Sequence, residues 1–110
     1  MENYTELTSV DQWKQVLERS SEKPVLVFKH STTCPVSAHA YGEFSSFEKQ
    51  MDRYLVKVIE HRSVSNEIAM DLGIQHQSPQ AFVIANGEAV WNASHWKITK
   101  KTLDTVTATL

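Results

Sequence analysis

The sequence contains a single cysteine, Cys34, among 110 residues. One cysteine excludes an internal disulfide, so the fold does not depend on an oxidising compartment, and we expect a cytoplasmic location. Glycine and proline are also scarce, with three of each, and the chain has no internal repeat, low-complexity tract or linker. A chain of this length can build one hydrophobic core without staples, so we expect a single domain over residues 1–110.

The sequence also lacks an excess of either charge. Its formal net charge is −2 at pH 7, and no basic stripe or cluster appears, so we expect no nucleic-acid surface. No apolar run approaches the ~20 residues that cross a bilayer, so we expect no membrane partner. Residues 1–6 (MENYTE) do not have the basic and then apolar pattern of a signal peptide.

Four segments have the apolar spacing that is typical of amphipathic helices. The first follows a capping box at residues 9–12 (SVDQ). The second begins at Pro35, because proline suits a first helical position. A third helix begins near Ser65 and ends at Gly73, and a fourth begins near Thr99. On the second and fourth helices, the residues expected to face the core are Ala40, Phe44, Phe47, Met51, Leu103, Val106 and Leu110.

Four apolar runs predict strands. Residues 25–28 (VLVF) form a continuous run, which suits a strand that is buried on both faces, and residues 54–59 (YLVKVI) predict a second strand. Residues 81–85 and 89–91 predict two more, and Asn86-Gly87 between them is a strong hairpin signal. The order α, β, α, β, α, β, β, α therefore predicts an α/β fold, with a four-stranded mixed sheet and helices on both faces.

Cys34 lies between the first predicted strand and the second helix, in the sequence TTCPVS. Peptide dipoles and unpaired N–H groups at a helix N-terminus stabilise a thiolate, so we expect Cys34 to be a nucleophile. Ser37 occupies the position where a dithiol enzyme carries its second cysteine. It either donates a hydrogen bond to the Cys34 thiolate or satisfies helix N–H groups. Because it cannot attack a disulfide, a mixed disulfide on Cys34 must be resolved by a second small thiol from solution.

Other polar and aromatic residues give weaker signals. Lys29 and His30 are neighbours in a strand and point to opposite faces, so at most one of them lies near Cys34. The histidines show no metal-ligand spacing, and we expect no metal site. His76 either lines the site or, as we favour for a loop histidine, lies in solvent. Packing roles in the core or at its rim are expected for Trp13, Trp91 and Trp96.

The chain resembles thioredoxin-like proteins along essentially its whole length, and more narrowly it resembles the monothiol bacilliredoxins. The residues that carry the resemblance are 29–37 (KHSTTCPVS), the pair Ser78-Pro79 before the hairpin, and Asn86-Gly87. The chain departs from thioredoxins and dithiol glutaredoxins at Ser37, and it lacks the thioredoxin signature Trp-Cys-Gly-Pro-Cys. The resemblance implies one thioredoxin-like domain with a monothiol site.

In that family, the cysteine of a Cys-Pro-X-Ser motif removes bacillithiol, a small cytosolic thiol, from oxidised client proteins. The resemblance therefore implies that Cys34 is the nucleophile of a motif completed by Pro35, Val36 and Ser37. It also implies that Pro79 is a cis-proline beside Cys34, and the main chain of Ser78 is expected to pair with a client or a small thiol. The resemblance further implies that no cofactor is bound, that bacillithiol is a co-substrate, and that a disulfide reductase recycles its oxidised form.

Two other functions compete with this interpretation. Monothiol glutaredoxins carry iron–sulfur clusters and also have one active-site cysteine followed by serine, but they usually have glycine where this chain has Pro35. A non-catalytic stress adaptor with a structural cysteine is the second alternative. The pH dependence of Cys34 alkylation distinguishes a reactive thiol from a structural one.

Overall fold

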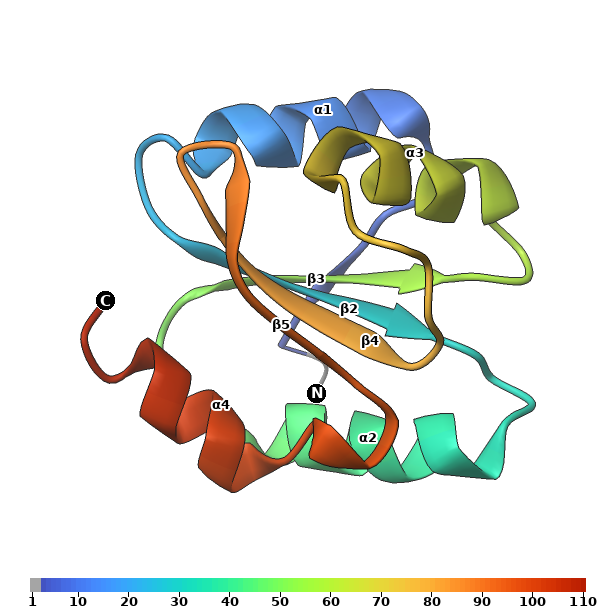
Figure 1. Ribbon diagram of the computed structural model, residues 1–110, viewed down its shortest axis with the longest axis vertical. Helices are drawn as coiled ribbons and strands as arrows, with labels where there is room; N and C mark the ends of the chain where they lie inside the picture. Colours follow the sequence, from blue (N-terminus) through green and yellow to red (C-terminus); the bar gives the residue numbers. More distant parts are fainter. Residues whose placement is uncertain (1–2) are drawn as a thin grey trace.

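A five-stranded mixed sheet lies between two layers of helices in the computed structural model, which describes residues 3–110 (Figure 1). This arrangement confirms the predicted α/β fold, although the sheet has five strands rather than four. The elements, in chain order, are β1 (Thr5–Glu6), α1 (Val10–Arg19), β2 (Val25–His30), α2 (Pro35–Ser46), β3 (Asp52–Lys57), α3 (Arg62–Leu72), β4 (Gln80–Ala85), β5 (Glu88–Ser94), the 3₁₀ helix η1 (His95–Lys97) and α4 (Lys100–Thr107).

The strand that the sequence analysis missed is β1, at one edge of the sheet. Its two residues, Thr5 and Glu6, pair in parallel with β3. Both are exposed, and neither belongs to an apolar run, so the local sequence carries no strand signal. The pairing depends on a contact that is distant in sequence: Leu7 is buried, and its N–H donates to the Leu55 carbonyl at 2.8 Å.

The central strand β2 divides the interior into two cores. It pairs in parallel with β3 and antiparallel with β4, in the sheet order β1-β3-β2-β4-β5. All of its residues except His30 are buried, which confirms the prediction for the apolar run at 25–28. Because side chains alternate along a strand, β2 contributes to both faces: Val25 and Val27 pack with α1 and α3, and Leu26 and Phe28 pack with α2 and α4.

Three helix predictions need correction. The helix α3 begins at Arg62 rather than near Ser65. The helix α2 ends at Ser46, and Phe47 continues in an extended conformation, so Met51 does not lie on the helical face that the spacing predicts. The Arg53 guanidinium donates to the carbonyls of Phe47 and Lys49, which satisfies carbonyl groups just after the helix. Beyond α4, Leu110 is exposed rather than in the core.

The turn and cap predictions are confirmed. Asn86 and Gly87 both have positive φ, 53° and 76°, as a two-residue type I′ hairpin requires. Gly73 ends α3 with φ 66°. The N–H groups of Gly73 and Ile74 donate to the carbonyls of Met70 and Ala69, the pattern of a Schellman cap. Ser9 forms the predicted capping box with Gln12.

Within residues 3–110, no helix has both the length and the apolar character that crossing a bilayer requires. The expectation of no signal peptide concerned residues 1–6, of which residues 1 and 2 lie outside the described part of the chain.

Glycines in two conformations give a matched test of the backbone. Gly87→Ala should lower the free energy of unfolding by about 1 kcal/mol or more, because its φ of 76° strains a residue with a Cβ. Gly42→Ala makes the same chemical change inside α2, where an added Cβ meets no atom within 4 Å. We expect a gain of about 0.5–1 kcal/mol there. Urea unfolding measures both, and effects of the same sign would contradict the assignment of the turn.

Candidate active site

The functional residues predicted from the sequence lie at one end of the sheet. Figure 1 shows the β2–α2 connection, the β3–α3 connection and the α3–β4 loop at the same end. The arrangement follows from topology, because β2 and β3 are parallel and both finish there, whereas the antiparallel β4 starts there. Loops at the carboxyl ends of parallel strands are the usual position of a ligand site in an open α/β sheet.

Cys34 is the residue immediately before α2. It is a free, half-buried cysteine in an extended conformation, and Pro35 follows at the first helical position. The Cys34 N–H donates to the Ser31 carbonyl at 3.2 Å, and the Cys34 carbonyl accepts from Ala38 at 3.0 Å. The first turn of α2 contains no acidic residue, so no carboxylate there opposes the positive end of the helix dipole.

Ser37 is fully buried, with 0% of its surface exposed. Its Oγ accepts from the Ser31 N–H at 2.9 Å and lies 2.7 Å from Nδ1 of His30. Within residues 3–110, no hydrogen bond joins Ser37 to Cys34, so the first of the two predicted roles is not seen; the N–H group that Ser37 satisfies belongs to Ser31, before the helix. The hydroxyl instead closes the loop of residues 31–37 that carries the cysteine.

His30 is the second hydrogen-bond partner of the Ser37 hydroxyl. Burial lowers the pKa of His30, Lys57 lowers it further, and Glu60 opposes the shift. In the neutral tautomer that carries its proton on Nε2, the Nδ1 lone pair accepts a hydrogen bond from the Ser37 hydroxyl. The ring also stacks between Phe28 and Tyr41, with centroids 5.6 and 5.0 Å away. The orientation of His30 is thus set by packing as well as by the hydrogen bond.

The Ser78-Pro79 bond is cis, as predicted. Pro79 is buried, and its carbonyl accepts from the His95 N–H at 3.1 Å. Ser78 is half-buried, and within residues 3–110 its Oγ is the one buried side-chain polar atom without a hydrogen-bond partner. The Ser78 main-chain N–H and C=O likewise form no hydrogen bond in this part of the chain.

A buried lysine on the opposite face of β2 was not predicted as part of the site. Lys29 is 0% exposed. Its Nζ lies 3.0 Å from the Ser65 carbonyl and 3.0 Å from Nδ1 of His76. The Ser65 hydroxyl is also 3.0 Å from the same nitrogen. The prediction that His76 lies in solvent is therefore wrong, because the ring contacts Lys29 of β2 and Ser65 of α3.

Burial in this cluster changes the pKa values of Lys29 and His76. Burial lowers the pKa of Lys29 from 10.5 to about 8. Burial also lowers the pKa of His76, and the positive charges of Lys29 and Arg62 add to that shift. The Lys29 ammonium can only donate, so Nδ1 of a neutral His76 ring accepts from it with its single lone pair. The opposite directions of Lys29 and His30 agree with the predicted alternation along the strand.

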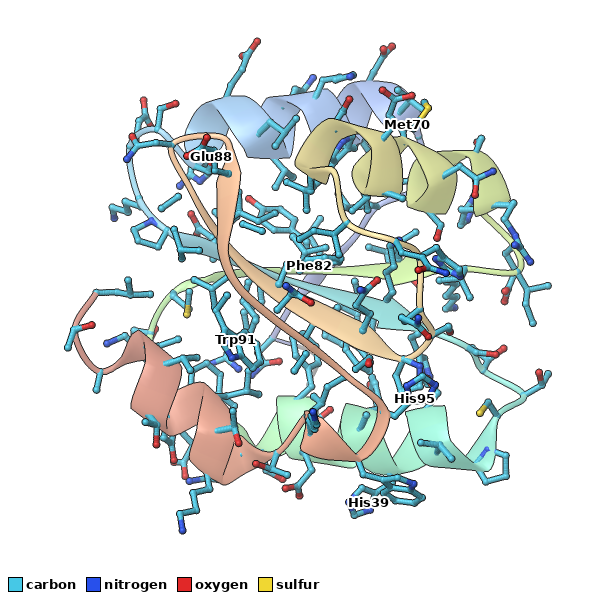
Figure 2. The ribbon with its side chains drawn as sticks, viewed as in Figure 1. His39, Met70, Phe82, Glu88, Trp91 and His95 are labelled. Carbon is cyan, nitrogen blue, oxygen red and sulfur yellow. The ribbon has the colours of Figure 1, made fainter. Side chains whose placement is uncertain are left out.

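The tryptophans differ in their surroundings. Trp13 is fully buried and Trp91 is half-buried against the core, in agreement with their predicted packing roles. Trp96 is 63% exposed, which excludes the core position among the two that were predicted for this residue, the core and its rim. It follows His95, whose positive φ of 55° turns the chain at the end of β5. The Trp96 ring contacts His39, with centroids 5.1 Å apart, and Figure 2 shows the His39 side chain projecting from α2 away from the sheet.

The depressed pKa of Lys29 predicts a pH-dependent stability difference from a Lys29→Met variant. Below pH 8 both the folded and the unfolded wild type carry the lysine proton, so the burial cost is full, roughly 3 kcal/mol. Between pH 8 and 10.5 the folded state loses the proton first. The free energy of unfolding of the wild type should therefore rise relative to Lys29→Met over that range. Urea unfolding at several pH values measures this, and a difference that is independent of pH would contradict the assignment.

The buried hydroxyl of Ser37 predicts a stability loss in Ser37→Ala. The variant leaves the Ser31 N–H without its acceptor and His30 Nδ1 without its donor, which should cost about 1–3 kcal/mol of unfolding free energy. Ser45→Ala on the same helix is the control, because Ser45 is exposed, and its effect should stay within about 0.5 kcal/mol. Equal denaturation midpoints for the two variants would show that the loop does not depend on Ser37.

Comparison with known proteins agrees with this geometry. A family model described as monothiol bacilliredoxin BrxC matches residues 5–103. A solved structure of a proposed oxidoreductase with a thioredoxin fold has 43% sequence identity and a TM-score of 0.85, covering 93% of this chain and 91% of that chain. The thioredoxins of Malassezia sympodialis and Schistosoma mansoni are more distant.

These two thioredoxins have 19% and 16% identity and TM-scores of 0.75 and 0.77. The alignments cover 99% and 97% of this chain, and 91% and 94% of those chains. At such identities they show the fold alone. The family match and the 43% identical structure go further. This chain belongs to the monothiol bacilliredoxin family and is a thiol–disulfide oxidoreductase with a thioredoxin fold.

Proposed function

We propose that this oxidoreductase removes bacillithiol from mixed disulfides on client proteins, with Cys34 as the nucleophile. The observation that carries the proposal is a free, half-buried thiol at the start of α2 with serine, not cysteine, one turn later. Membership of the monothiol bacilliredoxin family supports the choice of small thiol. A half-buried thiol is accessible to a disulfide, and the helix N-terminus favours its reactive thiolate form.

The reaction consists of two disulfide exchanges. In the first, the Cys34 thiolate attacks the bacillithiol sulfur of the client's mixed disulfide. The client S–S bond breaks, the client cysteine leaves as a thiolate, and Cys34 now forms a disulfide with bacillithiol. In the second, the thiolate of another bacillithiol molecule attacks the bacillithiol sulfur bound to Cys34. Cys34 leaves as a thiolate, and the product is the symmetric bacillithiol disulfide, which a separate disulfide reductase returns to two thiols.

The surroundings of Cys34 support exchange without an internal resolving group. The Ser37 hydroxyl is already engaged by Ser31 and His30, and an alcohol does not undergo disulfide exchange. The loop that presents the cysteine is closed by the bonds from Ser37 to Ser31 and from Cys34 to Ser31. A preorganised loop of this kind keeps the thiol in one orientation for in-line attack on a disulfide.

The segment before Pro79 supports recognition of an extended client. The main-chain N–H and C=O of Ser78 have no partner within residues 3–110, and unpaired backbone groups are a template for adding a strand. The cis bond and the His95 contact to the Pro79 carbonyl hold this segment from its C-terminal side. We assign Ser78 and Pro79 to client or small-thiol binding.

A single-turnover experiment tests the proposal. The protein is mixed with an equimolar client carrying a bacillithiol mixed disulfide, and intact mass follows both chains. We expect the client to lose one bacillithiol while Cys34 gains it, and free bacillithiol then to remove the adduct. Cys34→Ser should not speed the reaction above its rate without protein, because an alcohol cannot accept the adduct.

The same client carrying a glutathione mixed disulfide is the control for the identity of the small thiol. Faster transfer from the glutathione client than from the bacillithiol client would contradict the choice of bacillithiol. Full activity of Cys34→Ser would contradict the whole mechanism.

A further inference from the structure

We propose that Lys29 is a positioning residue for client binding: its ammonium group fixes the loop before cis-Pro79 so that the Ser78 main chain is held open for an extended client. This inference rests on the proposed function, because it assumes that clients pair with Ser78. Lys29 is otherwise outside the chemistry, since its side chain lies on the face of β2 opposite to His30.

The Lys29 side chain joins three separate parts of the chain. From β2, its Nζ reaches the Ser65 carbonyl in the first turn of α3 and Nδ1 of His76 in the α3–β4 loop, both at 3.0 Å. The Ser65 hydroxyl reaches the same His76 nitrogen at 3.0 Å. His76 is two residues before Ser78, so this cluster holds the loop just upstream of the cis bond.

A second set of bonds holds the loop on either side of His76. The Gln80 side chain accepts from the Gln77 N–H at 3.1 Å and donates to the Gln75 carbonyl at 3.2 Å. These bonds and the His76 cluster all stop before Ser78, whose main-chain groups have no partner within residues 3–110. The pattern of bonds therefore fixes the loop and leaves one residue of it available for a partner.

The buried charge of Lys29 indicates that this residue has a role other than stabilising the fold. No carboxylate contacts the amine within residues 3–110. The Phe82 ring lies 5.7 Å from Nζ, and the positive charge of Arg62 acts on the neighbouring His76. A buried cation without a counter-ion is unfavourable for folding, and an apolar side chain of similar length is often tolerated or stabilising in its place. What an apolar side chain cannot supply is a hydrogen-bond donor that joins β2 to His76 and to the Ser65 carbonyl.

Lys29→Met tests the inference. With a protein client carrying the mixed disulfide, we expect KM to rise about 10-fold, because a loop displaced by a fraction of an ångström presents the client poorly. We expect kcat to stay within about twofold. The rate with 2-hydroxyethyl disulfide, a small substrate that does not need a main-chain contact, should remain unchanged. The melting temperature of Lys29→Met should equal or exceed that of the wild type. Lys101→Met, at an exposed position of α4, controls for the loss of one positive charge.

A second variant keeps the test independent of how Lys29→Met folds. His76→Leu removes the same Lys29–His76 hydrogen bond by changing its partner in the loop. It should raise KM for the protein client by a similar factor. The double variant should show little further increase, because the two side chains act through one contact. A wild-type KM in Lys29→Met or in His76→Leu, or independent and additive effects, would overturn the inference.

A loss of rate with both substrates and a lower melting temperature would also overturn the inference, because Lys29 would then be structural only. Failure of the proposed function gives a different result. Cys34→Ser would then retain activity, whatever the effect of Lys29→Met on KM.

Discussion

The burial of β2 on both faces is the constraint on which the rest of this structure depends. This strand pairs with β3 on one side and β4 on the other and is buried at every residue except His30, and both helical layers pack against it. The next segment of the chain can leave only at the end of the strand. It therefore emerges where β3 also finishes and β4 starts. The position of Cys34 at that end is thus a consequence of core packing.

The alternation of side chains along β2 links the two halves of the site to this strand. His30 faces α2 and bonds to Ser37, so it holds the loop that carries Cys34. Lys29 faces α3 and bonds to His76, so it holds the loop that leads to Pro79. Two consecutive residues of one rigid strand thereby set the positions of two loops that are far apart in sequence. A site built on a buried strand needs little reorganisation when a client binds.

The sequence predicted what depends on local signals. Caps, the hairpin at Asn86-Gly87, the buried run at 25–28 and, through the family resemblance, the cis bond at Pro79 all agree with the structure. The features that it did not predict depend on contacts between distant segments. The β1 strand needs a partner in β3, and His76 contacts a lysine 47 residues away in sequence. No periodicity in the sequence records such a contact. The proposed roles of Cys34 and Ser78 remain to be tested.

Ser37 connects the fold to the way the enzyme must turn over. In dithiol relatives this position carries the resolving cysteine; here its side chain is buried and occupied by Ser31 and His30. The residue thus stabilises the loop that presents the thiol, and it leaves no group within the motif that resolves an adduct. In the proposed mechanism, release of Cys34 requires a thiol from solution, so the second exchange is bimolecular and its rate is proportional to the concentration of reduced small thiol. Under oxidising conditions that concentration falls, and the proposed mechanism then predicts that Cys34 accumulates as the mixed disulfide until the thiol pool recovers.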